Sequence, residues 1–221
     1  MTKETPLDTP QDTHQFTPEF RDEFLHLLRW RRDVRHFRTD PVDPDIFADC
    51  LKSFALAPSV GLSQPWRIID VKSDSARAAV QANFETANAE ALRGYTGETA
   101  ATYAGLKLAG LREAPIHLAV FCDDTTEKGK GLGAGTMPEM RRYSVVCAIM
   151  QFWLTLRSHG LGLGWVSILD AARLSADLDV PKGWALVGYL CIGWPETHEV
   201  DPELEQLGWE TRLPCPPVET R

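Results

Sequence analysis

The sequence predicts a single α+β domain. Helical and strand-like segments follow one another in the order helix, helix, strand, helix, helix, strand, helix, strand, helix, strand, and no repeat or linker divides the 221 residues. Hydrophobic residues make up 43% of the chain, which suffices for a core without disulfides or a structural metal. The formal charge of −8 argues against a protein that coats nucleic acid or lies on a membrane surface.

The N-terminal part contains two helices and a strand. Thr17-Pro18-Glu19 supplies an N-cap, a first-position proline and an acidic first turn, and an apolar stripe then continues to a cluster of arginines. A short helix over Pro44–Phe54 ends before Ala57-Pro58, and Trp66–Val71 is an Ile-rich strand. The preceding residues 1–17 are rich in Thr, Pro and Asp and are expected to form a disordered tail.

The middle of the chain contains three helical segments and a strand. Ser73 can cap a long helix, and the Gly-rich stretch Glu98–Arg112 is expected to be helical and to act as a mobile cover. Pro115–Cys122 predicts a buried strand. The helix expected over Pro138–His159 is apolar almost all round in its middle, so it must be enclosed either inside the domain or at a subunit interface.

The C-terminal part closes the predicted sheet. Gly160 ends the preceding helix, Leu163–Leu169 predicts a strand, and a short helix over Leu174–Leu178 leads to a last strand over Trp184–Ile192. The tail Glu203–Pro217 contains three prolines, too many for a packed element. Tails of this kind commonly wrap over a neighbouring subunit.

Several classes of protein are excluded by what the chain lacks. No apolar run approaches the roughly 18 residues of a membrane span, and the N-terminus has no secretory signal pattern. The cysteines and histidines are scattered without metal-ligand spacing, so we expect no metal site. Five free thiols indicate a reducing, cytoplasmic environment. The cysteines are Cys50, Cys122, Cys147, Cys191 and Cys215.

An arginine cluster contradicts the acidic average. Five arginines and one histidine lie within ten residues, namely Arg29, Arg31, Arg32, Arg35, His36 and Arg38. Guanidinium groups bind phosphate through paired hydrogen bonds, so the cluster suggests a small phosphorylated ligand, while a solvated basic face or a set of surface ion pairs stays open as the alternative. Asp33 lies among these cations, which should hold its carboxylate ionised and able to accept a proton, unless it merely neutralises its neighbours.

Two further segments are candidate ligand contacts. The loop Ala57–Trp66 contains small, polar and proline residues that can present backbone amides and hydroxyls to a flat ligand. In Gly162–Ser167, glycines permit close approach of a ligand to the backbone. Ser167 lacks the surroundings of a hydrolase nucleophile, so it either hydrogen-bonds a bound group or is an ordinary strand serine.

Together these pieces resemble the nitroreductase-like flavoprotein superfamily. The matching segments, in order, are Arg31–Arg35, Ala57–Trp66, Ala114-Pro115, Gly160–Gly162 and Gly193–Pro195. Reductases of this group usually have Ser in place of Asp33 and Asn in place of Leu62. These departures, together with Tyr143–Ile149 and Gly164–Ile168, are similar to the 5,6-dimethylbenzimidazole synthase family.

The resemblance implies a fold and an activity. It implies a nitroreductase-like domain over residues 18–221, with a mixed or antiparallel sheet flanked by helices, in an intertwined homodimer that exchanges the C-terminal extension from about residue 203. The family consumes reduced FMN and molecular oxygen, yielding 5,6-dimethylbenzimidazole, the lower ligand of cobalamin, with erythrose 4-phosphate. A separate reductase would supply the reduced flavin.

The resemblance also implies roles for individual residues. Asp33 would act as the catalytic acid–base group, and Ser167 would position the flavin. Arg212 would add a phosphate contact from the other subunit, and Leu108 would cover the flavin. The implied flavin-binding residues are Arg31, Arg32, Asp33, Val34, Arg35, Ser59, Gly61, Leu108, Ser167 and Arg212.

Two alternatives stay open from the sequence. The first is an NAD(P)H-dependent nitroreductase or flavin reductase that retains FMN, which Asp33 in place of Ser argues against. The second is a catalytically silent flavin-binding or scaffold protein.

Overall fold

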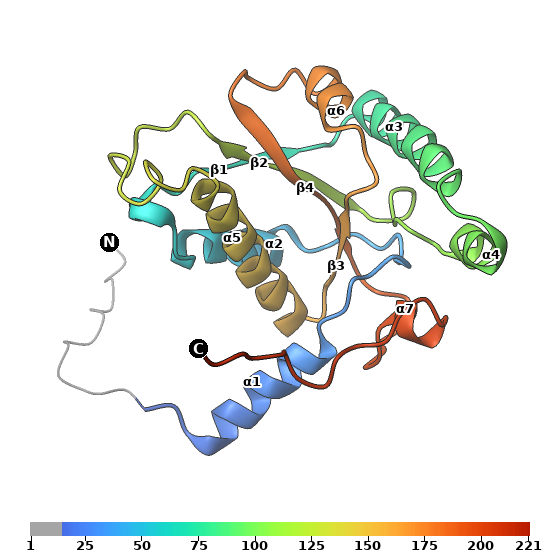
Figure 1. The fold of residues 1–221 in the computed structure, drawn as a ribbon, viewed down its shortest axis with the longest axis horizontal. Coiled ribbons are helices and arrows are strands. Elements are labelled where there is room, and N and C mark those ends of the chain that lie inside the picture. Colours follow the sequence, from blue (N-terminus) through green and yellow to red (C-terminus); the bar gives the residue numbers. More distant parts are fainter. Residues whose placement is uncertain (1–14) are drawn as a thin grey trace.

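A four-stranded antiparallel sheet organises the computed structural model, which describes residues 15–221 (Figure 1). The strand order is β1-β2-β4-β3, and all three neighbouring pairs are antiparallel. Of the two sheet types expected, the structure therefore has the antiparallel one. The strands are β1 Trp66–Asp70, β2 Ile116–Asp123, β3 Gly162–Val166 and β4 Trp184–Gly193.

The expected helices are present, and several begin at the predicted caps. Thr17 accepts a hydrogen bond from the Phe20 N–H, and Ser73 accepts one from the Ala76 N–H. Of the tail expected over residues 1–17, residues 1–14 lie outside the described residues. The helices are α1 Pro18–Trp30, α2 Pro44–Lys52, α3 Asp74–Leu92, α4 Gly97–Gly105, α5 Met140–Ser158, α6 Ala171–Asp177 and α7 Glu203–Gln206.

Several boundaries differ from the prediction. Helix α6 begins at Ala171 rather than Leu174, because Asp170 caps it, and α2 ends at Lys52, where a 3-10 turn over Ser53–Leu56 follows. Helix α4 ends at Gly105 rather than continuing to Arg112, because Leu106 takes an extended conformation. Strand β3 stops at Val166, since Leu169 turns back to donate to the Ser167 carbonyl before α6 begins. The prediction of a tail without packed elements is wrong at α7, where acidic residues follow Pro202 in the manner of a helix start.

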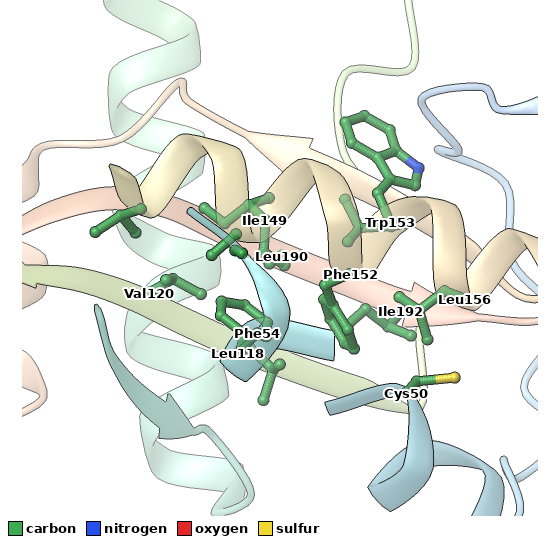
Figure 2. Packing of buried hydrophobic residues seen from close by; sticks show 14 of the residues in the cluster. Cys50, Phe54, Leu118, Val120, Ile149, Phe152, Trp153, Leu156, Leu190 and Ile192 are labelled. Atoms are coloured by element: carbon green, nitrogen blue, oxygen red, sulfur yellow. The ribbon is translucent and has the colours of Figure 1, made fainter. Parts of the chain in front are cut away.

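Helix α5 covers one face of the sheet, and α3 and α6 lie on the other (Figure 1). In β2 the buried side chains alternate: Leu118 and Val120 pack with α5, whereas Ala119 and Phe121 join the cluster that contains α3 and α6. Figure 2 shows Phe152 directed from α5 toward the strands and Trp153 on the other side of the helix. Strand β2 is therefore buried on both faces.

The core of this one chain encloses only one side of α5. Val145, Ile149 and Phe152 are fully buried, but Tyr143 is 50% exposed and Val146 is 41% exposed. The sequence pattern predicted that this helix is enclosed on every side. The domain interior therefore explains only half of the apolar residues on α5.

A buried histidine predicts how stability depends on pH. His117 is fully buried between the Tyr189 hydroxyl and the Ala114 carbonyl, and burial lowers its pKa from 6.5 to about 4. The unfolded chain takes up this proton first as pH falls. The free energy of unfolding should thus decrease between about pH 6.5 and 4, by up to roughly 3 kcal/mol.

Urea unfolding of wild type and of His117→Gln at several pH values checks this. The variant should lose this part of the pH dependence, while the exposed control His159→Gln should keep it. Equal slopes in wild type and His117→Gln would contradict the assignment.

No helix within residues 15–221 is long and apolar enough to cross a membrane.

Candidate functional site

Four residues predicted from the arginine cluster line one pocket of about 380 Å³. Arg32, Asp33, Val34 and Arg35 form one side, and the chain from Glu196 to Leu207 forms the other. Figure 1 shows the neighbouring α7 beside the C-terminal end of α1. The remaining lining residues are His36, Glu196, Thr197, Glu199, Asp201, Glu203, Gln206 and Leu207.

Two glycines let the chain after α1 lie directly against β3. The Val34 N–H donates to the Leu163 carbonyl at 3.0 Å, beside an isolated bridge between Asp33 and Leu163. A Cβ on Gly164 would lie 2.2 Å from the Val34 carbonyl oxygen, and one on Gly162 would lie 2.7 Å from the Val34 Cγ2. The sequence analysis expected a ligand to approach the backbone at these glycines. In the structure, Val34 of the same chain packs against them instead.

This contact fixes the Asp33 carboxyl group. Its Oδ1 accepts a hydrogen bond from the Trp165 N–H at 2.9 Å, and its Oδ2 accepts one from the Arg35 Nε at 3.0 Å. The Trp165 N–H is a site contact that the sequence reasoning missed, although Gly162–Ser167 had been singled out for its glycines. Hydrogen bonds to both carboxyl oxygens thus fix the orientation of the Asp33 carboxyl group.

Burial dominates the electrostatics of Asp33. Although 34% of its side-chain surface is open, the surrounding protein desolvates the carboxyl group and raises its pKa. The Trp165 N–H, Arg35 and Arg31 oppose this shift but do not cancel it. The arginines do favour the ionised carboxylate, as the sequence predicts, but burial, which the sequence does not reveal, outweighs them and raises the pKa. A carboxyl group with a raised pKa is better suited to hold and release a proton near neutral pH.

The arginines differ in whether their side chains already donate hydrogen bonds within the chain. Arg32 donates to the Val200 carbonyl at 2.7 Å and also to Arg29, while Arg35 holds Asp33. The half-buried Arg31 guanidinium lies 4.6 Å from the centre of the Trp153 ring. Within residues 15–221 it donates no hydrogen bond. Its N–H donors are therefore available to an anion.

Arg212 is engaged within its own chain. It pairs with Glu205 at 2.9 Å and with Asp201, which lines the pocket, at 3.3 Å. The acidic residues around α7 were missed by the sequence reasoning. The signal for them was the run of carboxylates between Glu196 and Glu210, opposite in charge to the arginine cluster.

The other predicted residues lie away from this pocket. The Ser59 hydroxyl accepts from the Gln64 N–H, and Gly61 has a φ of +55° and packs against the Gly129 carbonyl. Leu108 lines a separate pocket of about 280 Å³ beside α3. Ser167 is exposed just beyond β3, and no described residue bonds its hydroxyl group. One chain thus brings together only part of the predicted site.

The described residues contain no group of three or more His, Cys, Asp or Glu that could hold a metal ion. The available donors are guanidinium, hydroxyl and backbone N–H groups, which suit an organic anion.

Comparisons with known proteins bear on the family of this chain. The nitroreductase family model matches residues 28–194. The 5,6-dimethylbenzimidazole synthase of Rhodospirillum rubrum is 55% identical, over 87% of this chain and 91% of the relative. That of Rhodobacter capsulatus is 46% identical, over 85% and 91%.

Among solved structures, iodotyrosine deiodinase bound to FMN and 3-iodo-L-tyrosine matches with a TM-score of 0.68. It is 21% identical, and the match covers 89% of this chain and 97% of that one, which supports the fold alone. The antiparallel sheet, the arginine segment and the two synthase relatives lead to one conclusion: the chain belongs to the nitroreductase family.

Proposed function

We propose that this protein is a 5,6-dimethylbenzimidazole synthase, which fragments reduced FMN with molecular oxygen to 5,6-dimethylbenzimidazole and erythrose 4-phosphate. The product would serve as the lower ligand of cobalamin. The pyrimidine part of the flavin ring would leave as a third, oxidised fragment. The observation that carries the proposal is Asp33, a carboxyl group with a raised pKa that lines one pocket with Arg32 and Arg35. Two relatives named for this activity match most of the chain.

Arginines in and beside the pocket would bind the flavin phosphate, although five carboxyl groups, including that of Asp33, also line the pocket. Arg31 has N–H groups free to bind an anion, and Arg32 and Arg35 line the neighbouring pocket wall. Val34 would contact the flavin from the same segment, and Arg212 would contribute at the pocket edge. Bound reduced FMN would supply both the electrons for oxygen and the carbon skeleton of the product.

Asp33 would hold or move a proton beside the bound flavin. Its two hydrogen bonds, to the Trp165 N–H and the Arg35 Nε, fix the direction of the carboxyl group. Its raised pKa places proton exchange nearer to neutral pH than for an ordinary aspartate. Ser167, whose hydroxyl has no bond to a described residue, would hydrogen-bond the flavin, and Leu108 would limit access of water.

A second copy of the chain would complete the site. The Ser59–Gly61 loop leads into β1, while Asp33 lies against β3, and these are the two outer strands of the sheet. Three strand spacings, roughly 14 Å, separate the two edges, with α5 packed across the face between them. The exposed residues Tyr143 and Val146 on α5 offer an apolar face for the partner. Exchange of the C-terminal tail stays a prediction.

Val146→Glu tests this assembly. A charge on the apolar face of α5 should convert dimers into monomers and should weaken FMN binding strongly, because the Ser59–Gly61 loop of the partner would be lost. Sedimentation velocity and FMN titration measure the two effects. A matched control is Ala78→Glu, since Ala78 is exposed on α3, which packs on the opposite face of the sheet from α5. A Val146→Glu monomer that binds FMN as tightly as wild type would contradict the proposal.

The activity itself is tested by incubating the protein with chemically reduced FMN in air. The proposal predicts 5,6-dimethylbenzimidazole, detected by mass. Rapid NADH oxidation with a nitroaromatic acceptor and no benzimidazole would instead favour the reductase. Intact FMN after prolonged incubation, without either reaction, would favour a silent flavin-binding protein.

A further inference from the structure

The C-terminal strap, defined here as residues 200–212, already occupies three of the four arginines proposed to hold the flavin. Its Val200 carbonyl accepts a hydrogen bond from Arg32 at 2.7 Å. Its Glu203 carboxylate lies 3.9 Å from the Arg35 Nη1. Asp201 and Glu205 pair with Arg212 inside the strap. The strap therefore supplies oxygen atoms where the ligand would supply its own.

Glu203 is the strap residue whose carboxylate contacts Arg35, the arginine that also holds the Asp33 carboxyl group. Its Oε1 lies 3.2 Å from the His36 Nε2, and its Oε2 faces the same Arg35 that holds Asp33. The Arg35 side chain is only 12% exposed and that of Glu203 is 31% exposed. The contact is thus partly shielded from water, so salt screens it less than an ion pair at the open surface.

A second contact, between aromatic rings, attaches the strap to the segment around α4. The Trp209 ring lies 5.5 Å from that of Tyr95 and 6.1 Å from that of Tyr103, and the two tyrosines stack at 4.8 Å. Tyr103 belongs to α4 and Tyr95 precedes it. Anchored at Trp209 on one side and at Arg35 on the other, the strap lies across one side of the arginine pocket.

We propose that Glu203 is an internal competitor for the flavin site: its carboxylate engages Arg35 when no ligand is bound and must release it before reduced FMN can bind. This inference rests on the proposed function. A carboxylate and an anionic ligand repel each other at one guanidinium. The ligand therefore binds the fraction of molecules in which Arg35 is free, and its apparent affinity is reduced by that fraction.

The test is the affinity of the full-length protein for FMN, measured by quenching of flavin fluorescence. Glu203→Gln should bind FMN about two- to fivefold more tightly than wild type, the range expected for a partly exposed ion pair. Glu199→Gln is the matched control, because Glu199 lines the same pocket wall and pairs with no described residue. It removes the same charge without the contact, so its effect should be clearly smaller. Thermal unfolding verifies that both variants are folded.

Each other outcome is decisive. Equal gains in Glu203→Gln and Glu199→Gln would show a general effect of charge and would overturn the competitor role. Weaker or unchanged binding in Glu203→Gln would overturn it as well, while leaving the proposed function standing, since wild type binds FMN in either case. No FMN binding by wild type would overturn both.

Discussion

Asp33→Asn is expected to retain FMN binding and to lower 5,6-dimethylbenzimidazole formation by about 10²–10⁴-fold, the usual contribution of a positioned acid–base group. The amide oxygen can still accept from the Trp165 N–H, so the local backbone should keep its position. The amide cannot take up or release a proton in the range where the carboxyl does. FMN titration and product analysis by mass measure the two effects separately.

Asp40→Asn is the matched control for Asp33→Asn. Asp40 also accepts from an arginine two residues away, at 2.8 Å from the Arg38 Nε, but this pair is exposed at the surface. The control should retain full activity. An Asp33→Asn variant that forms product at the wild-type rate would remove Asp33 from the chemistry, whereas loss of FMN binding would assign it a binding role instead.

Gly164→Ala should have the second largest effect, through the position of Asp33. The new Cβ would lie 2.2 Å from the Val34 carbonyl oxygen, a backbone atom that can yield only if the segment after α1 moves. The Trp165 N–H bond to Asp33 would then lengthen. A displacement of about 1 Å can cost on the order of 100-fold in rate, so product formation should fall by at least tenfold.

Stability should decrease in the same variant. Overpacking costs about 1–3 kcal/mol, which corresponds to a fall of several degrees in Tm for a chain of this size. The control is Gly105→Ala at the end of α4, where an added Cβ would meet nothing within 4 Å. It should keep wild-type activity and Tm. A folded Gly164→Ala protein with full activity, assayed well below its Tm, would show that the contact between Val34 and β3 does not position Asp33.

Local signals predicted most of the fold. Thr17 and Ser73 cap α1 and α3 where hydroxyl side chains precede helical stripes, and Gly160 ends α5. These features depend on a few neighbouring residues, so they can be recognised without knowing the tertiary structure. Helix α7 was missed because the prolines of the tail, such as Pro214, were given more weight than the acidic residues that follow Pro202.

The candidate site was predicted less completely, because its geometry depends on contacts between distant segments. Arg32 and Arg35 do share a pocket with Asp33, as their spacing suggested, whereas Arg31 does not line it. The sign of the Asp33 pKa shift was not predictable, since it depends on how closely β3 encloses the carboxyl group. Likewise, nothing local in the sequence shows that Ser59 and Asp33 belong to opposite edges of the sheet.

The central claim is that this protein destroys the flavin it binds. The most direct test is a single turnover with reduced FMN labelled with ¹³C in the dimethylbenzene ring, in air, without NAD(P)H or any reductase. If the protein is a 5,6-dimethylbenzimidazole synthase, the label appears in 5,6-dimethylbenzimidazole as labelled FMN disappears. Recovery of all the label as intact oxidised FMN, with hydrogen peroxide as the only product of oxygen, would contradict it.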